Sequence, residues 1–157
     1  MSKLIAEKKR VPMVNIIIIN HNESELTIRN LVNIFDCTTK NSFEILLIDS
    51  GSTGKEIAVL KHGLKQLNKL RVKLKFFPYN IGYARANNWA AKNANGQMLA
   101  FLNNDIVVTK NWLEPLVRFL IKHPDAGACQ PKLRSQIEPE YFVCEGKGGN
   151  RLPRNGA

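Results

Sequence analysis

The chain has 157 residues, 44% of them hydrophobic and 23% charged, which suits one soluble domain with its own buried core. Its formal net charge of +10 favours a polyanionic partner, such as a phosphorylated ligand, an anionic membrane surface or nucleic acid. The basic residues are scattered and no nucleic-acid recognition motif accompanies them, so nucleic acid is not the favoured partner.

Strands are expected to alternate with helices along the first half of the chain. Residues 11–20 form a β-branched apolar run that predicts a strand buried on both faces and is too short to span a bilayer. A helix is expected over 21–35, with Asn22 and Glu25 as a capping box. Residues 43–49 predict a second buried strand, 54–70 a helix, and 71–77 a strand with one exposed face.

The same alternation continues in the second half. An Ala-rich helix is expected over 80–96, ending at Gly96, and a buried strand over 97–105. A helix is predicted over 111–123, where Pro115 lies near enough to the start to be tolerated, and a short strand over 126–133. The pattern predicts an α/β fold, a mostly parallel sheet with helices on both faces. We expect a basic leader over 1–10, one domain over 11–134 and a Gly-rich polar tail over 135–157.

Two nucleotide-binding motifs are excluded by local sequence. The stretch FEILLIDSGSTGKE ends in Gly54-Lys55 and resembles a phosphate-binding loop, but Asp49 occupies the place of its first glycine. Glu56 occupies the place of its metal-binding hydroxyl, and two carboxylates would repel the phosphates. The first strand is followed by INHNES, which lacks the glycines of a dinucleotide-binding fingerprint.

Three polar segments follow buried strands and are therefore expected on one edge of the sheet, where α/β proteins bind ligands. They are residues 21–23, 49–52 and 103–105. Asp49 is either a ligand for a base or ribose, or a turn or helix N-cap residue. Asn103, Asn104 and Asp105 offer oxygen ligands that suit Mg²⁺ or Mn²⁺, or else form an ordinary turn after a strand.

Four motifs carry a family resemblance. VNIIIINHN, FEILLIDSGS, NIGYARANN and FLNNDIVVTKNWLEPLV, in this order, resemble the motifs of family-two inverting glycosyltransferases with the GT-A fold. The LNND form resembles bacterial enzymes that add rhamnose or related sugars to surface polysaccharides. The resemblance covers residues 14–132. It implies transfer of a sugar, with inversion, from a UDP- or dTDP-linked donor to a saccharide or lipid-linked acceptor, assisted by a divalent metal, Mg²⁺ or Mn²⁺.

The resemblance also implies a role for each matching residue. Asp49 would hold the nucleobase or its ribose, with the backbone of His21 and Asn22 lining the same pocket. Gly82 would permit a tight turn, and Asn88 would support the donor pocket from its helix. Asn103 and Asn104 would bind the nucleotide-sugar, and Asp105 would ligate the metal. Since Asn103 replaces the first Asp of the family's DxD motif, weaker metal affinity is expected.

The catalytic base is not assigned. In the family it is an acidic residue on a later segment, which we expect beyond residue 157, and the spacing singles out none of Glu138, Glu140 and Glu145. The unassigned base and the positive charge motivate an alternative, a non-catalytic nucleotide- or polyanion-binding module with the same fold.

Composition also bears on location and assembly. The three cysteines are widely spaced, without a metal-binding pair, as in a reduced cytosolic protein. The expected location is the cytoplasm. Because the chain is basic, peripheral contact with the anionic inner face of the membrane is an open alternative. Homo-oligomer formation through an uncovered sheet edge is also left open.

Overall fold

The computed structural model describes residues 13–39, 42–67, 71–135, 142–143 and 151–152. The chain divides into two compact units, residues 1–114 and 115–157. The predicted leader lies outside the described residues, as does most of the predicted tail. The predicted domain boundary at residue 134 stays a prediction.

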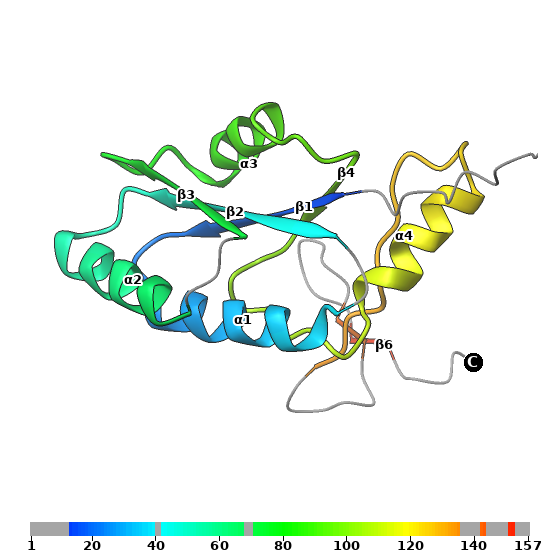
Figure 1. Cartoon of the computed structure of the whole chain (residues 1–157), viewed down its shortest axis with the longest axis horizontal. Helices are drawn as coiled ribbons and strands as arrows, with labels where there is room; N and C mark the ends of the chain where they lie inside the picture. The colour runs from blue at the N-terminus through cyan, green and yellow to red at the C-terminus, as the bar shows by residue number, and fades with distance from the viewer. Residues whose placement is uncertain (1–12, 40–41, 68–70, 136–141, 144–150, 153–157) are drawn as a thin grey trace, which may run out of the picture. The chain divides into compact units, whose positions relative to one another are not determined.

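The first unit contains a four-stranded parallel sheet (Figure 1). Its strands are β1 (Val14–Asn20), β2 (Phe43–Ser50), β3 (Val72–Phe77) and β4 (Met98–Phe101), in the order β3-β2-β1-β4. The β1–β2 pairing runs from Val14 opposite Phe43 to Asn20 opposite Asp49. This confirms the predicted α/β architecture.

Three helices cover the two faces of this sheet (Figure 1). α1 (Ser24–Cys37) and α2 (Gly54–Leu67) lie on one face, and α3 (Tyr83–Lys92) lies on the other. Because both faces are covered, the side chains of Ile16, Ile17 and Ile18 are all fully buried, although they alternate in direction. The continuous apolar run of β1 is therefore what a central parallel strand requires.

α1 and α2 cap each other at their first turns. The Ser24 N–H donates to Glu56 Oε2 at 2.9 Å, and the Thr53 N–H donates to Asn22 Oδ1 at 2.9 Å. The predicted capping box is wrong, since the N-cap residue is Glu23 and its side chain makes no capping hydrogen bond. Asn22 instead has a left-handed backbone, φ 56°, and serves the neighbouring helix.

Glu56 gains a lowered pKa from this arrangement. The Ser24 backbone N–H and then the Ser24 hydroxyl stabilise its ionised carboxylate, nearby Lys55 adds to the effect, and partial desolvation opposes it. The carboxylate therefore also complements the positive end of the α1 dipole.

β4 departs from the prediction of a buried strand over 97–105. It is shorter, and in the described part of the chain it pairs with β1 alone, so it forms one edge of the sheet. Leu99 is 39% exposed and Phe101 53% exposed. The apolar sequence was correctly taken as a strand, but burial on both faces does not follow from it.

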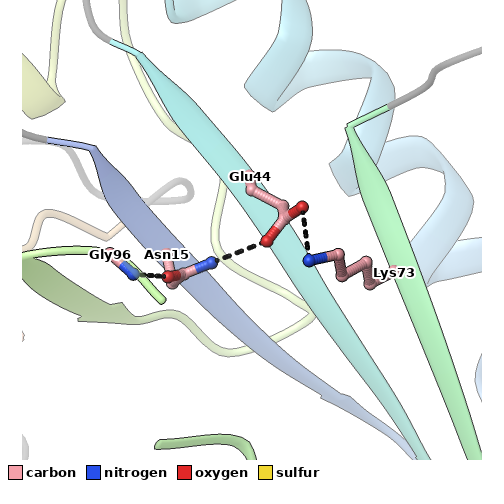
Figure 2. A network of polar contacts seen from close by, with 4 residues as sticks. All are labelled: Asn15, Glu44, Lys73 and Gly96. Atoms are coloured by element: carbon pink, nitrogen blue, oxygen red, sulfur yellow. Dashed lines mark hydrogen bonds and ion pairs between the residues drawn. The ribbon is translucent and has the colours of Figure 1, made fainter. Parts of the chain in front are cut away.

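α3 also ends earlier than predicted, at Lys92 rather than at Gly96. Gly96 has another role, because its N–H donates to the Asn15 side chain and a Cβ there would lie 2.6 Å from Asn15 Oδ1. Asn15 in turn donates to Glu44 Oε2 at 3.1 Å, and Glu44 pairs with Lys73 at 3.0 Å (Figure 2). A polar row therefore crosses β1, β2 and β3 near their amino ends.

The second unit holds little regular structure among its described residues. α4 (Leu113–Lys122) begins just before the division between the units and confirms the predicted helix. The strand predicted over 126–133 is wrong, because these residues form no strand. Pro131 lacks the N–H that a central strand needs. Where polar loop was predicted, β5 (Phe142–Val143) pairs antiparallel with β6 (Arg151–Leu152).

Candidate functional site

Asp49 lies near the end of β2 and is fully buried. Its Oδ2 accepts hydrogen bonds from Asn20 Nδ2 at 2.8 Å and Ser52 Oγ at 2.7 Å, and its Oδ1 accepts one from the Ser52 N–H at 3.0 Å. A buried carboxylate requires such donors to offset its lost hydration. The sequence left two roles open for Asp49, and this geometry is that of a residue that fixes a turn.

Asn20, the last residue of β1, links this turn to α1. It is fully buried, and its Oδ1 accepts a hydrogen bond from Thr27 Oγ1 at 2.7 Å. Thr27 Oγ1 also accepts one from Asn104 Nδ2 at 3.3 Å. The hydrogen bonds therefore run from Asp49 through Asn20 and Thr27 to Asn104. Sequence reasoning missed Asn20 and Thr27; Asn20 directly follows the apolar run 16–19, which is too weak a signal to single it out.

His21 and Asn22 lie beside this chain of hydrogen bonds and are exposed. His21 Nδ1 is 2.8 Å from the Ser50 carbonyl oxygen, which can only accept, so Nδ1 carries the proton. In the neutral ring Nε2 is then an acceptor, with Asn22 Nδ2 3.3 Å away. The Asn22 N–H donates to Ser52 Oγ at 2.8 Å, which joins both residues to the Asp49 turn.

Two glycines shape the same edge of the sheet. Gly51 has φ 72°, and a Cβ there would lie 2.2 Å from the backbone carbonyl carbon of Tyr79. Gly82 has φ 79° and directly precedes α3, and its N–H donates to Asn80 Oδ1 at 2.8 Å. Gly82 therefore has a backbone conformation that favours glycine, which is compatible with the tight turn that the resemblance implies.

Asn88 is not brought into this cluster. It is exposed on α3, whereas its neighbour Asn87 is nearly buried and donates to the Tyr83 carbonyl oxygen at 3.0 Å. The adjacent amides in the sequence gave no way to tell which one faces the sheet.

Asn103 to Ile106 form a turn after β4. The Ile106 N–H approaches the Asn103 carbonyl oxygen at 3.4 Å, and Asn30 Nδ2 donates to the same oxygen at 3.0 Å. Asn104 Nδ2 donates to Glu23 Oε2 at 3.0 Å. Asp105 is exposed at the tip. The turn therefore leaves a carboxylate facing solvent close to the amide-rich cluster.

The described residues at this edge of the sheet form hydrogen bonds to one another and do not form a metal site made of protein ligands alone. Among the described residues, no group of three or more His, Cys, Asp and Glu side chains gathers where it could hold a metal ion. Asp105 and neighbouring amide oxygens could still hold a hard divalent cation that is also bound by a ligand's phosphates and by water. Asp105, the predicted metal ligand, is therefore compatible with a cation site that protein and bound ligand would share.

Comparisons with known proteins agree with this geometry. The family profile described as Glycosyl transferase family 2 matches residues 15–143. The O-antigen biosynthesis protein RfbC of Myxococcus xanthus is 37% identical over 124 residues, which are 78% of this chain and 9% of that protein. An uncharacterized glycosyltransferase of Haemophilus influenzae is 29% identical over 113 residues, covering 72% of this chain and 44% of that protein.

Two solved structures are similar in fold. The mannosyltransferase PcManGT from Pyrobaculum calidifontis, in complex with GDP-Man and Mn²⁺, gives a TM-score of 0.64 at 22% identity, covering 80% of this chain and 35% of that one. TarS 1-349 of S. aureus gives 0.58 at 27% identity, covering 71% and 33%. The chain thus spans less than half the length of each of these four proteins. None of the helices in the described segments is long and apolar enough to cross a membrane.

Proposed function

The chain belongs to glycosyl transferase family 2, and we propose that it binds a nucleoside diphosphate-sugar at the carboxyl edge of its parallel sheet and transfers the sugar with inversion. The observation that carries this proposal is the hydrogen-bonded chain from Asp49 through Asn20 and Thr27 to Asn104. It connects the residues predicted to meet the base and the sugar, which are 55 positions apart in sequence.

In this proposal Asp49 acts by holding the base pocket in shape. Its full burial and its hydrogen bonds to Asn20 and Ser52 support a holding role rather than direct contact with the donor. His21 and Asn22 are exposed beside it, so they are the groups that would meet the nucleobase or ribose. Asn103 and Asn104 would lie against the ribose and sugar.

Asp105 is the proposed metal ligand, with Mg²⁺ or Mn²⁺ shared with the diphosphate. The support is its exposure at the tip of the turn and the Mn²⁺ bound by the structurally similar mannosyltransferase PcManGT. A bound cation would neutralise charge on the departing diphosphate. Since the protein contributes one carboxylate, we expect the metal to bind weakly without a nucleotide.

The proposed reaction is a single displacement. An acceptor hydroxyl forms a bond to the anomeric carbon, the bond from that carbon to the diphosphate oxygen breaks, and a carboxylate takes the hydroxyl proton. We propose a UDP- or dTDP-linked donor and a saccharide or lipid-linked acceptor in surface polysaccharide synthesis. The resemblance to rhamnose-adding enzymes and the similarity to RfbC support this choice, while the GDP-Man of PcManGT makes a GDP-linked donor the alternative to test.

A thermal-shift panel tests the donor site. The melting temperature is measured with UDP, dTDP, GDP and ADP, each with and without Mn²⁺, because a ligand of the folded state raises it by mass action. We expect one diphosphate to give a metal-dependent rise that Asp105→Asn abolishes. Asp36→Asn, the same change at an exposed position in the last turn of α1, should keep it. If no nucleotide stabilises the wild-type chain, the donor-site proposal is wrong and the non-catalytic module is favoured.

We also propose that the protein works in the cytoplasm and touches the inner face of the membrane. The formal charge of +10 supports attraction to anionic lipid, and exposed Lys or Arg near such a surface contributes about 1 kcal/mol each. Co-sedimentation with phosphatidylserine vesicles at low salt, and its absence with phosphatidylcholine vesicles, is the expected result. Equal recovery with both lipids would contradict electrostatic attachment.

A further inference from the structure

The turn that presents Asp105 is held from α1, on one face of the sheet. Asn30 donates to the Asn103 carbonyl oxygen, and Glu23 and Thr27 accept from the Asn104 side chain. The Asn103 backbone and the Asn104 side chain are thereby fixed to α1. None of these three contacts involves the Asn103 side chain.

Tyr83 supplies a contact from α3, on the opposite face. It is the first residue of α3 and follows Gly82, whose left-handed backbone sets the start of the helix. The Tyr83 hydroxyl donates to Asn103 Oδ1 at 2.8 Å, an ordinary distance for a well-formed O–H···O hydrogen bond. The residue is 57% exposed, so its hydroxyl contact, more than burial of its ring, gives this position a specific role.

We propose that Tyr83 is a positioning residue, whose hydroxyl fixes the Asn103 side chain and so holds the turn that presents Asp105. The turn is then held from both faces of the sheet: α1 contacts the Asn103 backbone and the Asn104 side chain, and α3 contacts the Asn103 side chain. The consequence for metal and donor binding rests on the proposed function; the hold on the turn does not. A phenol suits this task because it reaches across from the helix and carries a hydroxyl that can donate to an amide oxygen.

Tyr79 provides a matched control for Tyr83. It lies in the connection between β3 and α3, four residues before Tyr83, and is 68% exposed, and its hydroxyl makes no hydrogen bond to the described part of the chain. Tyr83→Phe and Tyr79→Phe therefore remove the same atom from neighbouring exposed rings. Asn103→Ala and the double variant Tyr83→Phe/Asn103→Ala complete a double-mutant cycle, which isolates the pairwise coupling.

The first measurement is hydrogen–deuterium exchange without ligand. The Leu102 N–H bonds to the Ile17 carbonyl oxygen and the Ile106 N–H to that of Asn103, so both amides report on this segment. We expect faster exchange over residues 102–106 in Tyr83→Phe than in Tyr79→Phe, by about 2- to 10-fold for one neutral hydrogen bond. The excess should disappear in the Asn103→Ala background. Equal exchange in the two single variants would overturn the proposal.

The second measurement is the Mn²⁺ concentration that gives half-maximal nucleotide binding, with whichever of UDP, dTDP, GDP and ADP stabilises the wild-type chain most. Tyr83→Phe should raise it by about 2- to 10-fold, and Tyr79→Phe should leave it unchanged. An unchanged Mn²⁺ requirement in Tyr83→Phe would overturn the role in metal binding. If none of UDP, dTDP, GDP and ADP stabilises the wild-type chain, the proposed function fails, and the exchange measurement still decides whether Tyr83 holds the turn.

Discussion

Replacing Asp49 with Asn removes one acceptor from the buried cluster, and no rotation of the new amide restores it. In one orientation the NH₂ group faces the Ser52 N–H, and in the other it faces Asn20 Nδ2 and Ser52 Oγ. Two donors oppose each other either way, unless neighbouring groups rearrange. Hydrogen bonds to a charged group contribute about 1.5–3 kcal/mol each, so a loss of about 2–5 kcal/mol in the free energy of unfolding is expected. That is a large share of the 5–15 kcal/mol typical of folded domains.

The assay is thermal unfolding of the wild-type chain, Asp49→Asn and the exposed control Asp36→Asn. At about 2–4 °C per kcal/mol for a chain of this size, Asp49→Asn should melt roughly 5–20 °C lower, while Asp36→Asn should change little. The rise in melting temperature that a nucleotide causes should also be smaller in Asp49→Asn than in the wild-type chain. Asp49 holds Ser52, and Ser52 Oγ accepts the hydrogen bond from the Asn22 N–H. A melting temperature for Asp49→Asn within about 2 °C of Asp36→Asn would refute the reasoning, because the carboxylate would then be dispensable for the turn.

Three further changes test other parts of the fold. Gly51→Ala should lower the free energy of unfolding by about 2–4 kcal/mol, because residue 51 has φ 72° and the new Cβ would overlap the Tyr79 backbone. An unchanged midpoint of chemical denaturation would contradict this. Glu56 has a lowered pKa, so its contribution is present above its ordinary value of 4.5 and is lost as pH falls through the folded value. The melting temperature of Glu56→Gln should thus lie below that of wild type at pH 7 and converge with it in acid, and a constant difference would count against the contact with Ser24. Asn15→Ala should cost about 1–3 kcal/mol of unfolding free energy, measured in urea, because the half-buried Gly96 N–H loses its acceptor; a neutral effect would show that water replaces the amide.

The strands β1 to β4 and the four helices were predictable because each signal is local. The β-branched run of β1 and the helical spacing in α1 and α4 are present in the sequence itself. The edge of the sheet that gathers the polar segments also followed, since parallel strands place their carboxyl ends together.

Features that depend on partners distant in sequence could not be predicted in this way. The cap of α1 comes from Glu56, 32 residues away, so a search for a local capping box found the wrong pair. Gly96 was taken for a helix end, whereas its N–H meets Asn15 across 81 residues. The exposure of Phe101 depends on strand order, which an apolar run does not encode. Asn20 was passed over because a lone amide at a strand end carries no pattern of its own.

The polar row in Figure 2 also has a consequence for how the strands align as they assemble. Asn15 lies opposite Glu44, and Asn20 lies opposite Asp49, so the same two neighbouring strands carry an amide–carboxylate pair near each end. If β1 slid along β2 by two residues, its apolar side chains would keep their faces, but both asparagines would be buried without their carboxylates. The pair at the amino ends therefore selects the alignment that the proposed donor site at the carboxyl edge requires, although it lies at the other end of the strands.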